Sequence, residues 1–293
     1  MEYANQLNDY APAWDAARVD EEVARIRQVA ESRNHRKEVY EFCYSAIDLT
    51  TLSCSDSVTS VTTFARKAAE FYEKYPHIPN VASICIYPAF VETVGVAVEG
   101  TPMRITSVAG GFPASQTFLE VKMLEVSMAV ENGADEVDIV LNVGRMLTGE
   151  YDEAANEVEV IRQETGEDVV LKVIIESGAL KTPELIRKAS LLSMFAGADF
   201  VKTSTGKIDV AATPEAAVVM CQAIRDYYEK TGRKVGFKPA GGVRTAEDAA
   251  LYYTVVEEIL GKEWLTTDLF RIGASSAANN ILSAIEGKTV KYY

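Results

Sequence analysis

The sequence contains one motif twice, GADEVDIV at residues 133–140 and GADFVKTS at residues 197–204. In each copy, Gly-Ala-Asp stands where a helix would end, and the short apolar run after it is typical of a strand. The two copies place Asp138 and Lys202 at the same position, five residues after the glycine. This repeat of a helix exit and a strand entry indicates a chain built from successive β-α units.

Eight short apolar or β-branched runs of this kind alternate with segments of 3.6-residue periodicity. Seven helical segments lie between the runs and one follows them, and Thr182, Thr213 and Thr245 are candidate N-caps. Eight strand-helix units in about 250 residues predict a (β/α)8 TIM barrel. The eight runs cover residues 46–52, 81–87, 104–109, 136–143, 169–175, 200–204, 234–238 and 269–273.

The boundaries of this barrel follow from the same pattern. We expect residues 41–293 to form one catalytic barrel domain with a short C-terminal tail. Residues 1–40 are polar and irregular around one helical stretch, and we expect them to form an N-terminal helical extension. The alternative fold is an open doubly wound sheet, which needs a glycine-rich turn after the first strand. Residues 53–58 (SCSDSV) contain no glycine, which favours the barrel.

Composition limits the possible partners. The 29 Lys and Arg residues against 43 Asp and Glu residues give a net charge of −14, which disfavours binding to nucleic acid or to anionic membranes. The N-terminus has no basic, apolar signal pattern, and no apolar stretch approaches the roughly 20 residues of a membrane span. The four cysteines show no CxxC spacing. These features predict a cytoplasmic protein.

With two histidines in the whole sequence, His35 and His77, a Ser-His-Asp triad or a zinc site is improbable. We therefore expect neither a metal nor a cofactor.

Charged residues occur inside five of the eight predicted strands, although parallel strands covered on both faces are normally runs of Val, Ile and Leu. A structural ion pair, or a charge facing outward, explains any one of them at least as well as a functional role. The whole set fits an active site better, because active sites lie at the carboxyl end of barrel strands. The five residues are Asp48, Asp138, Lys172, Lys202 and Lys238.

A lysine nucleophile that forms a Schiff base with a carbonyl group fits this set best. Only a neutral amine attacks, and a lysine with an ordinary pKa is neutral in about one molecule in 2,500 at pH 7. Burial and a second cation both favour the neutral form. Lys202 is the candidate nucleophile, Lys238 on the next strand could supply the second cation, and Asp138 could relay protons.

The Gly206-Lys207 pair resembles the end of a nucleotide-binding P-loop, but Val201 stands where that motif needs its first glycine. Gly206-Lys207, Gly241-Gly242 and Ser275-Ser276 instead follow the last three predicted strands. Glycine-rich turns and helix N-termini late in a barrel commonly bind phosphate. Each pair alone could be a simple turn; three in succession favour a phosphate site.

Several of these segments resemble those of the deoxyribose-phosphate aldolase family, which are class I, Schiff-base aldolases with a (β/α)8 fold. The resemblance runs from about residue 49 to residue 285. It implies reversible cleavage of 2-deoxy-D-ribose 5-phosphate to acetaldehyde and D-glyceraldehyde 3-phosphate, with a small phosphosugar as the ligand and a homodimer as the candidate assembly. The matching segments are ICIYP (84–88), GADEVDIV (133–140), LKVIIESG (171–178), DFVKTSTGK (199–207), GFKPAGGVRTAEDA (236–249) and RIGASS (271–276).

The resemblance also implies roles for individual residues. Lys202 would form the Schiff base, Lys238 would lower its pKa, and Asp138 would relay protons. Tyr293, the last residue, would reach into the site as a mobile proton-transfer group; a frayed tail is the alternative. The implied substrate-binding residues are Asp48, Thr50 and Cys85 at the substrate end, Lys172 in the polar network, and Thr205, Gly206, Lys207, Gly241, Gly242, Ser275 and Ser276 around the phosphate.

Two other functions remain open at the level of the sequence. Another Schiff-base barrel, an aldolase or transaldolase acting on a phosphorylated ketose, would use the same lysine chemistry. A non-catalytic barrel that only binds a sugar phosphate is disfavoured by the Lys202–Lys238 pair, because uncompensated buried charges destabilise a fold.

Overall fold

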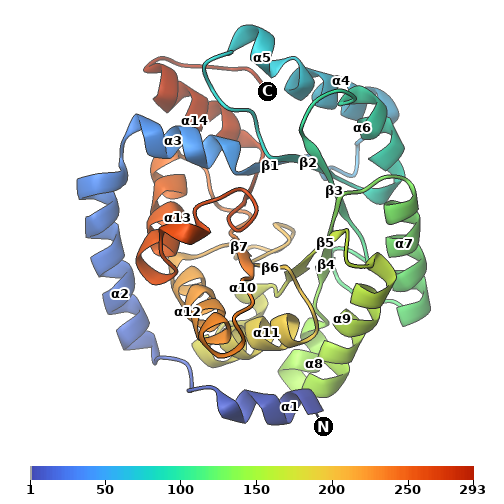
Figure 1. The fold of residues 1–293 in the computed structure, drawn as a ribbon, viewed down its shortest axis with the longest axis vertical. Helices are drawn as coiled ribbons and strands as arrows, with labels where there is room; N and C mark the ends of the chain where they lie inside the picture. Colours follow the sequence, from blue (N-terminus) through green and yellow to red (C-terminus); the bar gives the residue numbers. More distant parts are fainter. Residues whose placement is uncertain (1) are drawn as a thin grey trace.

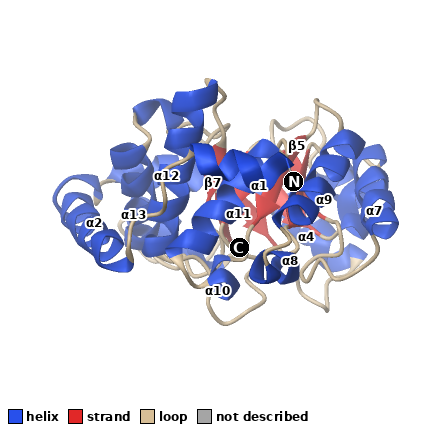
Figure 2. Ribbon diagram, turned by 90° about the horizontal axis from the view of Figure 1, so that it is seen from below, coloured by secondary structure: helices blue, strands red, loops and turns tan. Residues whose placement is uncertain are grey.

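Eight parallel strands pair in sequence order around a central axis, and helices surround them (Figures 1 and 2). The structure is a computed structural model that describes residues 2–293. Seven neighbouring strand pairs form continuous ladders from β7 (Gly236–Lys238) round to β8 (Ile272–Ala274). The bridges Phe237–Phe270 and Ala240–Gly273 join β7 to β8. The predicted (β/α)8 barrel is therefore confirmed.

Each predicted strand is present, although all eight are shorter than the apolar runs that predicted them. The last strand lies further along than expected, because Leu269 and Phe270 donate their backbone N–H groups to Thr266 and so belong to a turn. The strands are β1 (Ile47–Thr50), β2 (Ser83–Ile86), β3 (Arg104–Val108), β4 (Glu136–Val140), β5 (Val170–Ile174), β6 (Phe200–Lys202), β7 (Gly236–Lys238) and β8 (Ile272–Ala274).

The helical layer begins where the sequence places its caps. The side chains of Thr182, Thr213 and Thr245 each accept a backbone N–H from the first turn of the following helix. The helices and 3-10 turns after β1 are α4 (Val58–Ala69), α5 (Phe71–Lys74), η3 (Pro88–Phe90), α6 (Val91–Ala97), α7 (Leu119–Glu131), α8 (Val143–Thr148), α9 (Tyr151–Thr165), α10 (Ser177–Leu180), α11 (Pro183–Phe195), α12 (Pro214–Thr231), α13 (Ala246–Ile259), η4 (Lys262–Trp264) and α14 (Ser276–Glu286).

The N-terminal segment lies against the outside of the barrel, along α13 and α12 (Figure 1). Its main helix, α2, buries Val19, Val23 and Ile26, which are spaced three or four residues apart on one face. The segment has more helix than the one stretch that the sequence predicted, because the short α1 depends on a tertiary contact: the N–H of Ala4 bonds to Asp152 of α9. The elements are α1 (Glu2–Gln6), η1 (Leu7–Asp9), α2 (Ala16–Val29), the π-helical turn η2 (Ala30–Asn34) and α3 (Lys37–Ser45).

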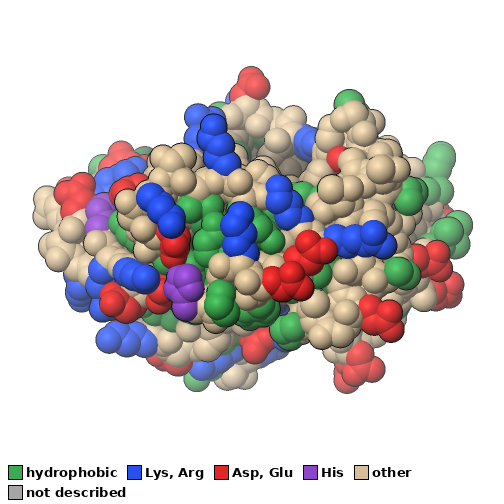
Figure 3. Space-filling view, turned by 90° about the horizontal axis from the view of Figure 1, so that it is seen from above, with side chains coloured by type: hydrophobic (Ala, Val, Ile, Leu, Met, Phe, Trp, Pro, Cys, Tyr) green, Lys and Arg blue, Asp and Glu red, His purple; other side chains and the backbone are tan. Residues whose placement is uncertain are grey.

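The face drawn in Figure 3 carries both acidic and basic side chains, and hydrophobic side chains gather near its middle. Within residues 2–293, no helix combines the length and apolar character needed to cross a membrane.

Candidate active site

Lys202 and Lys238 contact the same carboxylate oxygen inside the barrel. They are register partners on β6 and β7. The Nζ atoms of Lys202 and Lys238 lie 2.7 and 2.8 Å from Oδ2 of Asp138 on β4. The equivalence of Asp138 and Lys202 in the repeated motif therefore corresponds to a direct contact across the barrel.

Lys172 on β5 occupies the other oxygen of this carboxylate. Its Nζ lies 3.1 Å from Oδ1 of Asp138 and 2.5 Å from Oε2 of Glu136. Burial alone would raise the pKa of Asp138, but the three lysines outweigh it and hold that pKa well below its usual value. Asp138 is therefore ionised in the free protein.

Two buried residues that the sequence did not single out complete the charged cluster. The guanidinium of Arg271 lies 2.6 Å from Oδ1 of Asp48 and 2.7 Å from Oε1 of Glu136. Burial would raise the pKa of Glu136, but Lys172 and Arg271 lower it to about 2. The sequence pattern could have predicted both residues as members of the cluster. Glu136 stands two positions before Asp138, on the same face of a strand, and Arg271 is a charge inside an apolar run.

We name the seven residues of this network the charged cluster. Its four buried cations and three buried carboxylates sum to 4 − 3 = +1 when every group is ionised, so these seven are balanced when one lysine loses its proton. Arg104, which contacts Glu136 at 3.2 Å from outside the cluster, is itself paired with Asp268. All seven side chains are buried. The members are Asp48, Glu136, Asp138, Lys172, Lys202, Lys238 and Arg271.

Lys202 holds its proton less tightly than Lys238 does. Burial is the largest influence and lowers its pKa; the Asp138 carboxylate opposes this, and the charge of Lys238 lowers the pKa further. The net shift is downward. Lys238 differs because Asp138 and Asp48 both pair with it, and they raise its pKa despite burial. Lys238 therefore keeps its proton and Lys202 is the group that becomes a neutral amine.

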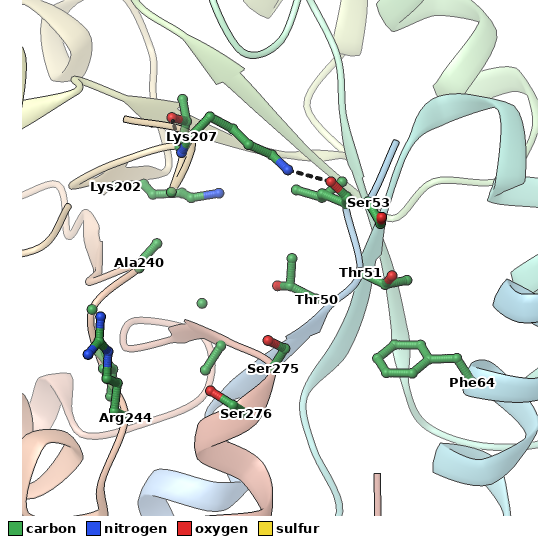
Figure 4. Close-up of a pocket in the computed structure, with 18 residues that line it drawn as sticks. Thr50, Thr51, Ser53, Phe64, Lys202, Lys207, Ala240, Arg244, Ser275 and Ser276 are labelled. Carbon is green, nitrogen blue, oxygen red and sulfur yellow. Dashed lines mark hydrogen bonds between the residues drawn. The ribbon is translucent and has the colours of Figure 1, made fainter. Parts of the chain in front are cut away.

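A cavity of about 500 Å³ opens at the carboxyl ends of the strands, and Lys202 extends into it (Figure 4). Within residues 2–293, Lys202 is the one member of the charged cluster that lines this cavity. The other six lie behind it. Nine predicted site residues line the cavity, namely Thr50, Lys202, Thr205, Gly206, Lys207, Gly241, Gly242, Ser275 and Ser276.

Two glycine turns and a helix start form one side of the cavity. Gly206 and Gly241 have φ values of 72° and 71°, in the left-handed region that favours glycine. A Cβ on Gly241 would lie 3.2 Å from the Cα of Gly206 and 2.8 Å from the Cβ of Ala211. The turns after β6 and β7 are thus packed against each other, and Ser275 and Ser276 begin α14 beside them.

Besides Lys202, two cations line this cavity. Lys207 reaches across from the turn after β6 and donates to the carbonyl oxygen of Leu52 (Figure 4). Arg244, which the sequence analysis did not select, lines the cavity just after the glycine pair at 241–242. Its position two residues after Gly242, in the GGVR segment, could have indicated a place in the phosphate site. An anionic group in the cavity would meet backbone amides, hydroxyl groups and two cations.

Three predicted substrate contacts lie outside the cavity. Asp48 and Lys172 are enclosed in the charged cluster, where ion pairs use their polar atoms. Cys85 packs with Leu52 and Val108 in a small apolar group behind the cavity. Burial raises the pKa of the Cys85 thiol. These side chains support the site and do not line it.

Tyr293, expected as a mobile group that reaches into the site, lies outside this cavity in the structure. Its hydroxyl group is 2.9 Å from that of Tyr44, and Asn279 hydrogen-bonds its backbone N–H and C=O groups. It lines a second cavity of about 450 Å³, which shares Phe64 with the first. The tail is docked by these contacts, so entry into the site would require it to leave them.

Fold and site together define the class of protein. The site holds a lysine amine with a lowered pKa, beside a second lysine and a carboxylate, at the carboxyl end of a (β/α)8 barrel. This arrangement is typical of enzymes that use a lysine nucleophile. Within residues 2–293, no three His, Cys, Asp or Glu side chains form a group that could hold a metal ion. Within this class the chain belongs to the DeoC/LacD family of aldolases, whose family model matches residues 42–276.

Known relatives agree with this family assignment. The deoxyribose-phosphate aldolases of Mus musculus and Homo sapiens are 45% and 43% identical to the chain over 250 residues, or 80% of this chain and 77% of each relative. The tetrameric deoxyribose-phosphate aldolase of Aeropyrum pernix superimposes with a TM-score of 0.66 at 27% identity, covering 88% of this chain and 96% of that one. The aldolase QR15 does so with a TM-score of 0.67 at 27% identity, covering 83% and 96%.

Proposed function

We propose that this protein reversibly cleaves 2-deoxy-D-ribose 5-phosphate to acetaldehyde and D-glyceraldehyde 3-phosphate through a Schiff base on Lys202. The observation that carries the proposal is the buried amine of Lys202, which combines a lowered pKa with access to the cavity. The family of the chain and the names of its relatives support the choice of substrate.

The chemistry follows from a neutral amine beside a carboxylate. The nitrogen of Lys202 attacks the aldehyde carbon C1 of the open-chain sugar, and loss of water leaves an iminium ion. Removal of the proton from the C3 hydroxyl group then breaks the C2–C3 bond, releases D-glyceraldehyde 3-phosphate and moves the electron pair into an enamine. Protonation of C2 and hydrolysis of the imine release acetaldehyde and restore Lys202.

We assign the proton transfers to Asp138, and to Lys238 the charge that controls them. Asp138 is ionised, so it accepts a proton from the reacting groups and returns that proton in a later step. Lys238, 2.8 Å from Oδ2 of Asp138, remains charged and keeps the amine of Lys202 neutral. Asp48, Glu136, Lys172 and Arg271 hold these groups in place and balance their charge.

We assign the phosphate group to the side of the cavity that holds the glycine turns. Gly206, Gly241 and Gly242 line this side without side chains, so a ligand can approach their backbone closely, although the N–H of Gly241 already bonds to the carbonyl of Gly273. Ser275 and Ser276 begin α14 beside them. Lys207 and Arg244 add positive charge, which a protein of net charge −14 must concentrate locally in order to bind an anion.

Tyr293 is proposed as a proton-transfer group that enters the site after the tail leaves Asn279 and Tyr44. The sharing of Phe64 by the two cavities supports a short path between them.

We further propose a cytoplasmic homodimer. Four unpaired cysteines suit a reducing compartment. Exposed apolar side chains on and beside α7 suit a contact between two copies; Phe118 is 77% exposed and Leu124 62%. Light scattering after size-exclusion chromatography measures the assembly, and Leu124→Glu is expected to give monomers.

Trapping with borohydride tests the covalent step. Incubation with 2-deoxyribose 5-phosphate and borohydride should add the reduced acetaldehyde unit to the peptide that contains Lys202. The Lys207→Met variant is the matched control, because it removes a cation of the same cavity and should still be labelled at Lys202. A mass on Lys172, or no mass on any peptide, would contradict the proposal. Phosphorylated ketoses are tested in parallel and should leave no adduct.

A further inference from the structure

Glu176 is a buried carboxylate for which the proposed mechanism has no role. It follows β5 and immediately precedes α10, with a side chain that is only 5% exposed. Its backbone is left-handed, with φ 52° and ψ 60°, which is unfavourable for a residue with a long side chain. Such a conformation persists only where surrounding contacts stabilise it. The contacts of Glu176 therefore indicate the role of its side chain.

Both carboxylate oxygens of Glu176 are bound by one residue of the next loop. Oε2 lies 2.5 Å from Oγ1 of Thr205 and Oε1 lies 3.2 Å from its backbone nitrogen. A second close approach supports the pairing of the loops, since a Cβ on Gly178 would overlap the carbonyl oxygen of Val210. The loop after β5 is therefore joined to the loop after β6 at two points.

The contact with Glu176 continues into the cavity. Thr205 Oγ1 accepts the backbone N–H of Lys207 at 3.0 Å while it donates its own proton to Glu176. The hydroxyl group is thus oriented from both sides, and the turn at 205–207 is fixed. Gly206, at the centre of this turn, packs against Gly241 and lines the cavity. Glu176 does not line the cavity and acts through Thr205.

We propose that Glu176 is a positioning residue that holds the turn at 205–207 in the shape that binds the substrate phosphate. The inference rests on the proposed function, because it concerns the phosphate end of that same site. Lys202 is on the strand before the turn, so the imine chemistry does not depend on Glu176. Loss of the contact should weaken binding of phosphorylated substrates and leave the reaction of unphosphorylated aldehydes unchanged.

The test is Glu176→Gln, which keeps the size of the side chain but replaces one acceptor oxygen with an NH2 group. Thr205 donates two hydrogen bonds to Glu176, from its hydroxyl group and its backbone N–H. Because the glutamine side chain has one acceptor oxygen, one of these bonds is lost. We expect KM for 2-deoxyribose 5-phosphate to rise about tenfold, which is the loss of one hydrogen bond to a charged group. We expect kcat to change less than threefold, and kcat/KM for unphosphorylated 2-deoxyribose to stay within twofold. Borohydride trapping with acetaldehyde alone should be unchanged.

Asp199→Asn is the matched control, because Asp199 also accepts a backbone N–H, from Leu171, but at the opposite end of β6. It should lower thermal stability and should not change the ratio of kcat/KM between 2-deoxyribose 5-phosphate and 2-deoxyribose. If Glu176→Gln does not fold, Glu176→Asp is the second variant, which keeps the charge but is too short to reach both donors. We again expect a higher KM for the phosphorylated substrate and an unchanged kcat/KM for the unphosphorylated one.

Equal losses on both substrates, or no loss on either, would overturn the role of Glu176. Failure of the unmodified protein to cleave 2-deoxyribose 5-phosphate would instead overturn the proposed function.

Discussion

Lys202 and Lys238 donate to the same oxygen, Oδ2 of Asp138, at 2.7 and 2.8 Å. Two ammonium groups on one oxygen repel each other, and the repulsion falls when either loses its proton. Lys238 has a second carboxylate partner in Asp48, whereas Lys202 faces the cavity. The pairing therefore favours Lys202 over Lys238 as the amine that loses its proton.

Replacement of Lys238 with leucine is expected to move the pH–rate profile toward alkaline pH. The variant removes the cation that helps to keep Lys202 neutral, so the pKa of Lys202 rises, and each unit of rise costs about tenfold in neutral amine below that pKa. We expect kcat/KM at pH 7 to fall at least tenfold and to recover partly at pH 9. Lys207→Met, which removes a cation at the mouth of the cavity, should leave the midpoint of the profile in place. An unshifted profile for Lys238→Leu would remove Lys238 from this role.

Glu136→Gln and Arg271→Met are expected to shift that profile in opposite directions. Glu136→Gln removes a negative charge from the cluster, which favours neutral Lys202, lowers its pKa and moves the rising limb to lower pH. Arg271→Met removes a positive charge, so the pKa of Lys202 rises and the limb moves to higher pH. Each shift should be about one pH unit, as for other close charges. Shifts of the same sign would contradict the charge balance; circular dichroism checks that both variants fold.

Gly241→Ala is expected to raise KM for the phosphorylated substrate. The new methyl group would meet Ala211 and the backbone of Gly206 in a left-handed conformation, so the two glycine turns must separate. We expect an increase of about tenfold or more in KM and a loss of about 1–2 kcal/mol in the free energy of unfolding. Gly149→Ala is the control, since Gly149 has φ 82° but nothing within 4 Å of a new Cβ. It should lose stability alone, with KM unchanged.

Tyr293→Phe is expected to slow the exchange of the methyl protons of acetaldehyde with solvent deuterium. A positioned acid or base commonly raises the rate of a proton transfer 10²–10⁴-fold. If Tyr293 shares this role with Asp138, its loss should slow the exchange about tenfold. NMR follows the exchange directly. Tyr292→Phe is the control, because its hydroxyl group donates to the carbonyl of Lys67 and lies outside the site. Unchanged exchange, with a lower melting temperature only, would mean that the docked position of Tyr293 is its functional one.

Ile26→Ala tests our proposal that residues 1–40 are an accessory segment outside the catalytic barrel. Ile26 is fully buried on α2, which packs against α12 and α13. A cavity at this site should cost about 2–5 kcal/mol of the free energy of unfolding. Labelling of Lys202 by borohydride at 20 °C, measured on the folded fraction, should be unchanged. Loss of labelling in folded protein would show that the segment shapes the site.

The repeated motif at 133–140 and 197–204 already contained much of the site. Their shared place in the repeat made Asp138 and Lys202 equivalent, and the alternation of side chains along a strand directs both to the barrel interior. The same rule applied to Glu136 would have added it to the cluster. The glycine and serine pairs after the last three strands were found because turn residues carry a local signal.

Glu176 and the docking of Tyr293 had no such signal. Each depends on a partner from another loop or helix, Thr205 in one case and Tyr44 with Asn279 in the other. Neither partner follows from the neighbours of the residue in sequence.

By itself, the sequence determined the barrel and the order of its strands, because hydrophobic period, caps and turn residues act within a few positions. It also predicted which lysine is the nucleophile. Only the tertiary structure decided which charges share an oxygen and which one reaches the cavity. Asp138 and Lys238 are 100 residues apart. Their contact depends on the stagger of strands that close a barrel, and no local stretch of sequence specifies that stagger.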